Sequence, residues 1–318
     1  MAIKTQLTEL LDIEHPILLA PMDVVSGGKL AAAVSAAGGL GLIGAGYGDG
    51  DWIEGEFAAA GNQVVGAGFI TWSLAKQPEL LDRALAHNPA AIMLSFGDPA
   101  PFVEKIKDAG AKLICQVQTV AEARAAVDLG ADVIIAQGTE GGGHGGTRAT
   151  FTLTPAVIDA VAPVPVAAAG GVADGRGLAA ALMLGAAGVL VGTRFYAAQE
   201  ALGADAAKAR IVEASGDETV RGKVFDIVRK TDWPEPLTGR VLKNDFAKRW
   251  LGNEANLKEN LAAEVSRYDK AKAQGDFDTA AVIAGECVDL IHDLPPAGEI
   301  VVAMVRDAEA LLKGGWTR

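Results

Sequence analysis

One histidine of this chain stands inside a run of glycines. His144 lies in the segment QGTEGGGHGG (137–146), directly after an apolar run. Glycines on both sides remove bulk from around the imidazole and let backbone amides face a ligand. An unperturbed imidazole has a pKa of about 6.5, so a neutral base is available near neutral pH. We therefore predict that His144 is an acid/base residue rather than an incidental histidine in a flexible loop.

The remaining histidines have ordinary explanations. His15 precedes a proline near the start of the chain, His87 ends a surface helix, and His292 lies in the closing segment. Of these, His292 alone is placed where it could approach an active face. The sequence thus offers one strong acid/base candidate.

A second group of residues is suited to holding an anion. Gly170 and Gly171 end one apolar run, and Gly192 and Thr193 end the next. Glycine amides after two neighbouring strands, facing a helix N-terminus, form a phosphate site in many α/β barrels. The Thr193 hydroxyl adds a further donor. We expect a phosphate-bearing ligand here, in preference to glycines needed only for tight turns.

Residues at the ends of other predicted strands have two possible roles. Ala20, Pro21 and Met22 end the first apolar run, and they suit either core packing or the flat ring of a cofactor. Gln116 and Gln137 end the fifth and sixth runs. Their amides would hydrogen-bond either ligand oxygens or the backbone of nearby loops. Residue type alone leaves these alternatives open.

Composition excludes several classes of function. The formal net charge of −12 argues against nucleic acid or an anionic membrane as a partner. We find no HExxH, no CxxC and no clustered carboxylates, so we expect no metal. Cys115 and Cys287 do not form a disulfide framework, which suits a reducing compartment. Without an apparent signal peptide or membrane span, we expect a soluble cytoplasmic protein.

The elements that would position these residues alternate regularly between residues 16 and 195. Short apolar runs, typical of strands buried on both faces, alternate with amphipathic helical patterns. Gly38, Gly110, Gly130 and Gly185 follow helical patterns as C-caps. The strands are expected at 16–22, 39–46, 64–70, 90–96, 112–117, 132–138, 164–170 and 188–194, and helices at 29–37, 78–87, 101–109, 120–129, 155–161 and 174–184.

Eight strands joined by crossover helices predict an α/β fold, a (β/α)8 TIM barrel. A doubly wound open sheet is the alternative, because the pattern does not show closure. Residues 1–203 would form the barrel. Residues 204–280 are polar and helical in pattern, which predicts a helical insertion with no strand of its own. Residues 281–318 would return to the barrel, with the last barrel helix at 296–313.

Several segments together resemble the nitronate monooxygenase family, formerly called 2-nitropropane dioxygenases. Besides the histidine loop, the resemblance covers nearly the whole chain. It is carried by APMDVVSGGKLAAAVSAAGGLGLIGAGYGD (20–49), AAGGVADG (168–175), GAAGVLVGTRF (185–195), VFDIVRKTDWP (224–234) and AGECVDLIHDLPPAGEIV (284–301).

The resemblance implies a non-covalent FMN at the carboxyl ends of the barrel strands. The family's phosphate site would map onto Gly170, Gly171, Gly192 and Thr193, and its catalytic histidine onto His144. That histidine removes an α-proton from neutral nitroalkanes, whereas alkyl nitronates arrive already deprotonated. Oxygen completes denitrification to a carbonyl compound and nitrite. The other flavin contacts would be Ala20, Pro21, Met22, Gly68, Gln116, Gln137, Gly142 and Gly143.

The chain departs from its relatives in ways that affect redox tuning and substrate. Many relatives carry Asn where this chain has Gly68, and some carry Lys or an acidic residue near Gln116 and Gln137. An NAD(P)H:quinone reductase or an FMN-type enoyl-acyl-carrier-protein reductase on the same scaffold is the nearest alternative. A flavin-free phosphosugar isomerase or lyase and a non-catalytic flavin-binding module are more distant ones. The use of NAD(P)H and assembly as a homodimer stay open.

Overall fold

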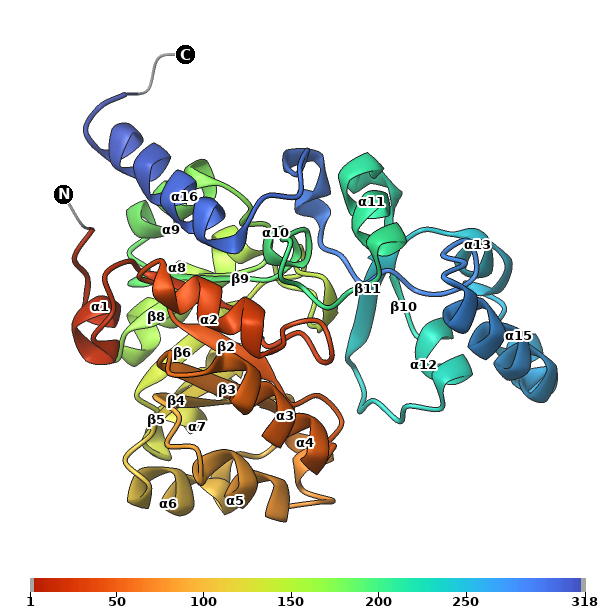
Figure 1. The fold of residues 1–318 in the computed structure, drawn as a ribbon, viewed down its shortest axis with the longest axis horizontal. Coiled ribbons are helices and arrows are strands. Elements are labelled where there is room, and N and C mark those ends of the chain that lie inside the picture. Colours follow the sequence, from red (N-terminus) through yellow and green to blue (C-terminus); the bar gives the residue numbers. More distant parts are fainter. Residues whose placement is uncertain (1–2, 316–318) are drawn as a thin grey trace.

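The eight predicted strands form one parallel sheet that curves into a barrel (Figure 1). Its hydrogen-bonded order is β1-β9-β8-β6-β5-β4-β3-β2. The bridge between Leu18 and Leu40 joins β1 to the residue before β2 and so closes the circle. The barrel strands are β1 (Ile17–Leu19), β2 (Gly41–Gly44), β3 (Val65–Ile70), β4 (Ala91–Ser95), β5 (Lys112–Val117), β6 (Val133–Gln137), β8 (Val166–Ala169) and β9 (Gly188–Val191).

Helices cover the outside of this barrel in the computed structural model, which describes residues 3–315. One outer helix follows each barrel strand, so the predicted (β/α)8 fold is confirmed. These helices are α2 (Gly28–Ala36), α3 (Gly50–Ala60), α5 (Glu79–Leu85), α6 (Ala100–Asp108), α7 (Val120–Asp128), α8 (Thr150–Val161), α9 (Gly175–Met183) and α16 (Ala297–Leu312), with short helices α4 (Thr71–Leu74) and α10 (Thr193–Tyr196).

Local sequence signals explain where several helices end. Gly38, Gly110, Gly130 and Gly185 follow helices with φ of +91°, +76°, +92° and +93°. Glycine adopts this left-handed conformation without the cost that a Cβ would add, so the predicted C-caps are confirmed. Helix α8 begins at Thr150, five residues before the predicted start at residue 155. Helix α3 was not predicted from the sequence pattern.

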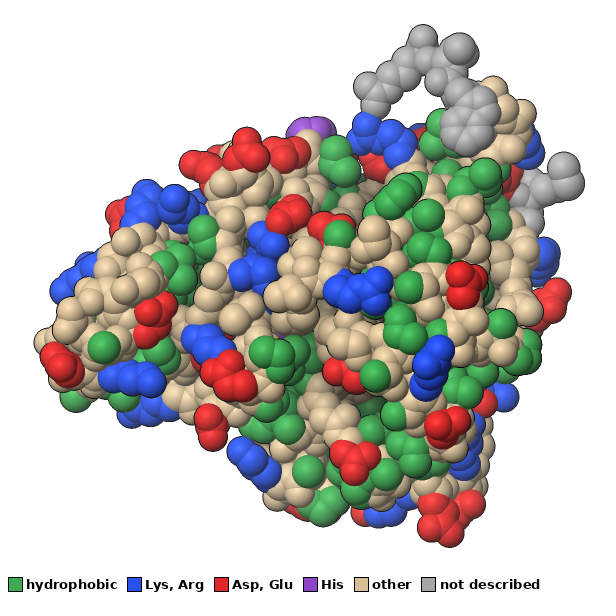
Figure 2. Space-filling model, turned by 180° about the vertical axis from the view of Figure 1, so that it is seen from behind, with side chains coloured by type: hydrophobic (Ala, Val, Ile, Leu, Met, Phe, Trp, Pro, Cys, Tyr) green, Lys and Arg blue, Asp and Glu red, His purple; other side chains and the backbone are tan. Residues whose placement is uncertain are grey.

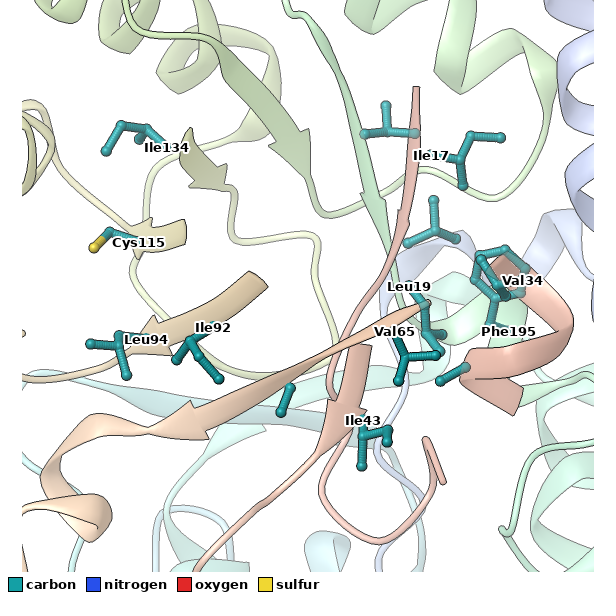
Figure 3. Close-up of a cluster of buried hydrophobic side chains, with 14 of the residues drawn as sticks. Ile17, Leu19, Val34, Ile43, Val65, Ile92, Leu94, Cys115, Ile134 and Phe195 are labelled. Atoms are coloured by element: carbon teal, nitrogen blue, oxygen red, sulfur yellow. The ribbon is translucent and has the colours of Figure 1, made fainter. Parts of the chain in front are cut away.

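Two apolar layers hold the barrel together. The larger lies between strands and outer helices, and Figure 3 shows its members Ile17, Leu19, Val34, Ile92 and Leu94. The smaller fills the barrel interior and includes Leu18, Met93 and Ile135. Helix α1 (Gln6–Leu11) adds Leu7 and Leu11 to this interior cluster. Burial on both faces accounts for the nearly continuous apolar character of the strand sequences.

The insertion between β9 and α16 is not purely helical, which corrects the prediction for residues 204–280. Strands β10 (Thr219–Gly222) and β11 (Thr238–Leu242) pair antiparallel, and β11 also pairs with β7 (Gly143–Gly145) of the glycine loop. The remaining elements are α11 (Asp205–Glu213), η1 (Gly216–Glu218), α12 (Val224–Arg229), α13 (Asp245–Trp250), α14 (Glu254–Glu259), α15 (Leu261–Gln274) and η2 (Glu286–Leu290).

The insertion projects to one side of the barrel and has an apolar cluster of its own (Figure 1). Phe225, Phe246, Trp250 and Tyr268 contribute to this cluster from α12, α13 and α15. Helix α16 instead lies beside α9 on the barrel, as a returning eighth helix should. The exact division of the chain at residues 203 and 280 stays a prediction.

Charged side chains are mixed on the face seen in Figure 2. Acidic and basic groups alternate there with apolar side chains, so neither sign gathers into one large patch on this face. Among residues 3–315, none of the helices is both long and apolar enough to cross a membrane.

Candidate active site

A cavity of about 430 Å³ opens at the carboxyl ends of the barrel strands, between the barrel and the insertion. This volume lies in the usual range for small-molecule sites. Every residue that the sequence singled out for chemistry or cofactor contact lines this cavity: Ala20, Pro21, Met22, Gly68, Gln116, Gln137, Gly142, Gly143, His144, Gly170, Gly171, Gly192 and Thr193. The structure therefore brings the predicted site residues together in one cavity.

The ends of β8 and β9 present unpaired amides to the cavity. Within residues 3–315, the N–H groups of Gly171, Gly192 and Thr193 donate no hydrogen bond to the protein. Gly170 and Gly171 have φ of +97° and +78°, a conformation that favours glycine. Because unpaired backbone donors need a partner, this arrangement fits a phosphate or another anion.

Space is limited around two glycines of the cavity wall, Gly170 and Gly142. A Cβ on Gly170 would lie 2.9 Å from the Gly138 carbonyl oxygen, and one on Gly142 would lie 2.7 Å from the Ala284 carbonyl carbon. The Thr193 hydroxyl accepts a 2.9 Å hydrogen bond from Gly285 N–H. Segments from the barrel and from the chain after the insertion thus meet at one narrow glycine-lined wall.

The glycine loop is held by the insertion rather than free. Strand β7 pairs with β11, and His144 lies opposite Gly239. Arg221 donates to the carbonyl oxygens of Thr139 at 3.1 Å and Gly145 at 2.8 Å. Arg240 donates to the same Thr139 oxygen at 3.0 Å. These contacts fix the backbone on both sides of the histidine.

The side chains of the two predicted glutamines, Gln116 and Gln137, contact each other next to the glycine loop. Gln137 Nε2 donates to the His144 carbonyl oxygen at 3.0 Å, and Gln116 Nε2 donates to Gln137 Oε1 at 3.2 Å. Gln118 also donates to Gln137 Oε1, at 2.9 Å. The sequence left open whether these amides bind ligand oxygens or the loop backbone. In the structure, Gln137 binds the loop backbone. Both predicted glutamines nevertheless keep a surface on the cavity.

The departure at Gly68 has a steric explanation. A Cβ built on Gly68 would lie only 2.2 Å from Pro21 Cγ. Pro21 therefore occupies the volume that a larger side chain at position 68 would need. The absence of a side chain at Gly68 leaves room for the Pro21 ring, and the two residues together form an apolar part of the cavity wall.

The His144 imidazole is almost completely enclosed. Its side chain is 8% exposed, and Nε2 lies 3.0 Å from both carboxylate oxygens of Asp226, which is also 8% exposed. Burial lowers the pKa of the imidazole, the hydrogen bond and charge of Asp226 oppose this, and Arg229 and Arg221 lower it further. The net shift is downward, so the imidazole is neutral at neutral pH.

An aromatic cluster supports one face of this histidine. The Trp233 ring is parallel to the imidazole, with centroids 3.4 Å apart. Trp233 also makes edge contacts with Tyr47, Trp72 and Phe96, which come from the barrel. Its Nε1 donates to the Tyr47 hydroxyl at 2.8 Å. Trp233 therefore connects the insertion, the histidine and the barrel.

Three charged side chains line the cavity. Asp23 comes from the segment after β1, Arg229 ends α12, and Lys272 lies on α15. Burial raises the pKa of Asp23, and the positive charges of Arg229 and Lys272 oppose the shift. Arg229 also lies over the Tyr47 ring, 5.7 Å from its centroid. Arg229 and Lys272 therefore offer two cations to an anionic portion of a ligand.

Sequence reasoning missed the insertion's contribution to this site. Asp226 and Trp233 both lie in VFDIVRKTDWP (224–234), a segment that carried the family resemblance but received no role. An acidic residue and a tryptophan within a family-matching segment were the available signal. Among the described residues, no group of His, Cys, Asp and Glu is arranged to hold a metal ion.

A barrel with an anion cradle at the ends of its last two strands, facing an enclosed imidazole, is typical of barrel enzymes that hold a phosphorylated ligand at this face. A family model described as nitronate monooxygenase matches residues 4–88 and 70–307. The chain belongs to the nitronate monooxygenase family and is an oxidoreductase.

Curated relatives and solved structures carry several names. A nitronate monooxygenase of Metarhizium robertsii is 34% identical, covering 93% of this chain and 91% of that protein. A (3aS,4S,5R,7aS)-5-hydroxy-7a-methyl-1-oxo-octahydro-1H-indene-4-carboxyl-CoA dehydrogenase of Mycobacterium tuberculosis is 32% identical, covering 97% of each. The structure of FabK from Thermotoga maritima superposes with a TM-score of 0.85 at 32% identity, covering 98% of each chain.

Proposed function

We propose that this protein is an FMN-dependent nitronate monooxygenase that converts alkyl nitronates, and neutral nitroalkanes after deprotonation, to carbonyl compounds and nitrite with oxygen. The observation that carries the proposal is the enclosed imidazole of His144 in the same cavity as the unpaired amides after β8 and β9. Family membership and the Metarhizium robertsii relative agree with it.

The cavity residues fit FMN. Gly170, Gly171, Gly192 and Thr193 would hold its phosphate with their amides, and the apolar wall of Ala20, Pro21 and Met22 would contact its ring. Gly68, Gln116, Gln137, Gly142 and Gly143 are the remaining proposed contacts. When bound, FMN supplies the electron transfer between substrate and oxygen.

The protein groups would prepare the substrate for that chemistry. His144 takes the α-proton of a neutral nitroalkane, which leaves the electron pair on the nitro group as a nitronate. The Gly142 N–H has no partner among the described residues and is a candidate donor to a nitronate oxygen. Tyr268, Phe277 and Ile283 line the side toward the insertion and would exclude water from the reacting carbon.

A second candidate is a pyridine-nucleotide-dependent reductase on the same scaffold, either an NAD(P)H:quinone reductase or an FMN-type enoyl-acyl-carrier-protein reductase. The Mycobacterium tuberculosis relative is named a carboxyl-CoA dehydrogenase, and the likeness to FabK keeps this class open. Arg229 and Lys272 would suit the phosphates of a nucleotide or of coenzyme A.

Stopped-flow spectroscopy of the purified protein distinguishes the two candidates. For a nitronate monooxygenase we expect a yellow protein whose flavin is reduced by ethylnitronate, with nitrite released only when oxygen is present. Rapid flavin reduction by NADH or NADPH without nitrite release would instead identify a reductase. A protein that is colourless and takes up no added FMN would overturn both.

A further inference from the structure

The segment 224–234 contributes a carboxylate whose place in the reaction is not explained by the cofactor or substrate contacts. Asp226 is on α12, more than eighty residues after His144, yet both of its oxygens lie 3.0 Å from His144 Nε2. Its side chain is 8% exposed, and the Thr231 hydroxyl lies 3.4 Å from Oδ1. A carboxylate enclosed at this position requires a specific partner.

Hydrogen-bond chemistry determines which nitrogen carries the proton. An ionised carboxylate only accepts hydrogen bonds, and a neutral imidazole has a single N–H. The N–H of His144 must therefore be at Nε2, where it faces Asp226, and the lone pair must be at Nδ1. Nδ1 has no hydrogen-bond partner among residues 3–315 and is not fully buried, and His144 lines the cavity.

We propose that Asp226 is a positioning residue, which holds His144 in the Nε2–H tautomer so that Nδ1 is the atom that takes the substrate proton. The assignment of the substrate proton rests on the proposed function, whereas the tautomer does not. Trp233 contributes by stacking on the ring at 3.4 Å, so rotation about the Cβ–Cγ bond would clash with the indole.

The proton transfer involves only the substrate, His144 and Asp226. The C–H bond next to the nitro group breaks, its proton bonds to Nδ1, and its electron pair moves into the nitro group. His144 becomes an imidazolium whose Nε2–H stays directed at the Asp226 carboxylate, which stabilises the new charge. Arg229 on the same helix and Arg221 on β10 oppose that charge, so Asp226 is the group that favours it.

Nitrogen-detected NMR of the imidazoles tests the tautomer independently of activity. The chain has only four histidines, so the His144 signals can be assigned by comparison with a His144→Asn variant. At pH 7 in the full-length protein we expect an unprotonated Nδ1 and a protonated Nε2. In Asp226→Asn we expect this preference to weaken, since an amide can donate as well as accept. A proton on Nδ1 in the wild type, or spectra unchanged in Asp226→Asn, would overturn the proposal.

Kinetics tests the consequence for the reaction. In Asp226→Asn we expect kcat/KM for nitroethane to fall by about 10²-fold or more, the usual contribution of a general base. Turnover of pre-formed ethylnitronate should change much less, and Asp226→Glu should recover part of the loss. Asp245→Asn is the matched control, since Asp245 is an exposed carboxylate of the insertion paired with Lys248. Equal losses on both substrates, with flavin retained, would reduce Asp226 to a structural role.

The two kinds of failure are distinguishable. If no nitro compound is a substrate, the proposed function fails, but the NMR experiment still decides the tautomer. If the nitro compounds are substrates and the tautomer is wrong, only the role of Asp226 is lost. Should Asp226→Asn fold poorly, Thr231→Val removes the hydroxyl next to Asp226 Oδ1 and gives a milder version of the same comparison.

Discussion

The imidazole of His144 lies flat against the indole of Trp233, with ring planes 4° apart and centroids separated by 3.4 Å. One ring comes from a loop of the barrel and the other from the insertion, so their stacking joins the two parts at the cavity. Because Trp233 is 7% exposed and also contacts Trp72 and Phe96, it is part of an aromatic core rather than a movable cover.

Trp233→Ala should therefore lower both stability and activity. Loss of a buried tryptophan typically costs about 3–5 kcal/mol, which urea unfolding would detect. Trp233→Phe keeps an aromatic ring against the imidazole and should lose less. If Trp233→Ala unfolds at the same urea concentration as the wild type and keeps its nitroethane turnover, the stacking has neither role.

His144→Asn tests the base directly. We expect turnover of nitroethane to fall by about 10²–10⁴-fold, while pre-formed ethylnitronate remains a substrate, because it needs no proton removal. Nitrite release and oxygen uptake measure both reactions. His87→Asn is the control, since His87 is outside the cavity and pairs with Glu54. Full activity of His144→Asn on nitroethane would remove it from the mechanism.

The pH dependence follows from the lowered pKa of His144. A base acts in its deprotonated form, and burial, the largest cause, brings its pKa below 6.5. Activity on nitroethane should therefore be constant around neutrality and fall with acid, with its midpoint below pH 6.5. In Asp226→Asn the midpoint should move lower still, because the group opposing the shift is gone. A midpoint above pH 7 in the wild type would contradict the assignment.

Gly192→Leu should reduce flavin binding without unfolding the barrel. A Cβ at Gly192 would make ordinary contacts, 3.5 Å from Ala20 Cβ and Met22 Sδ, but a longer side chain would enter the proposed phosphate cradle. We expect Kd for FMN to rise by at least about tenfold, or 1.4 kcal/mol. The flavin absorbance per protein and fluorescence titration measure this. Gly55→Leu is the control, since a Cβ there meets nothing within 4 Å.

Gly68→Ala should destabilise the barrel through its clash with Pro21. The new Cβ would lie 2.2 Å from Pro21 Cγ, and overpacking of this kind costs about 1–3 kcal/mol. If the clash is the cause, Pro21→Gly combined with Gly68→Ala should be more stable than the sum of the single changes. Strict additivity in urea unfolding would show that the two positions do not interact.

The barrel was predictable because its signals are local. A strand buried on both faces, such as Val133–Gln137, is recognisable as an apolar run, and a C-cap such as Gly185 shows at the end of a helical pattern. The same logic placed His144 and the glycines that follow β8 and β9 at one face, since the carboxyl ends of parallel strands meet there.

The strands of the insertion were not predictable in this way. All residues of Thr219–Gly222 are partly exposed, so β10 has no apolar run, and β7 is the three-residue segment Gly143–Gly145. The pairing of β7 with β11 joins segments about 95 residues apart, which no local pattern contains. The contact between His144 and Asp226 depends on this pairing and was missed for the same reason.

The pairing of β7 with β11 also limits how the protein can be altered by recombination. His144 sits on a strand whose hydrogen-bonding partner is encoded far downstream. A chimera that exchanged only residues 204–280 with a relative would present a foreign strand to the native loop and change the setting of the imidazole. Residues 137–146 and 204–280 should therefore be exchanged together, so that β7 keeps the β11 strand with which it pairs.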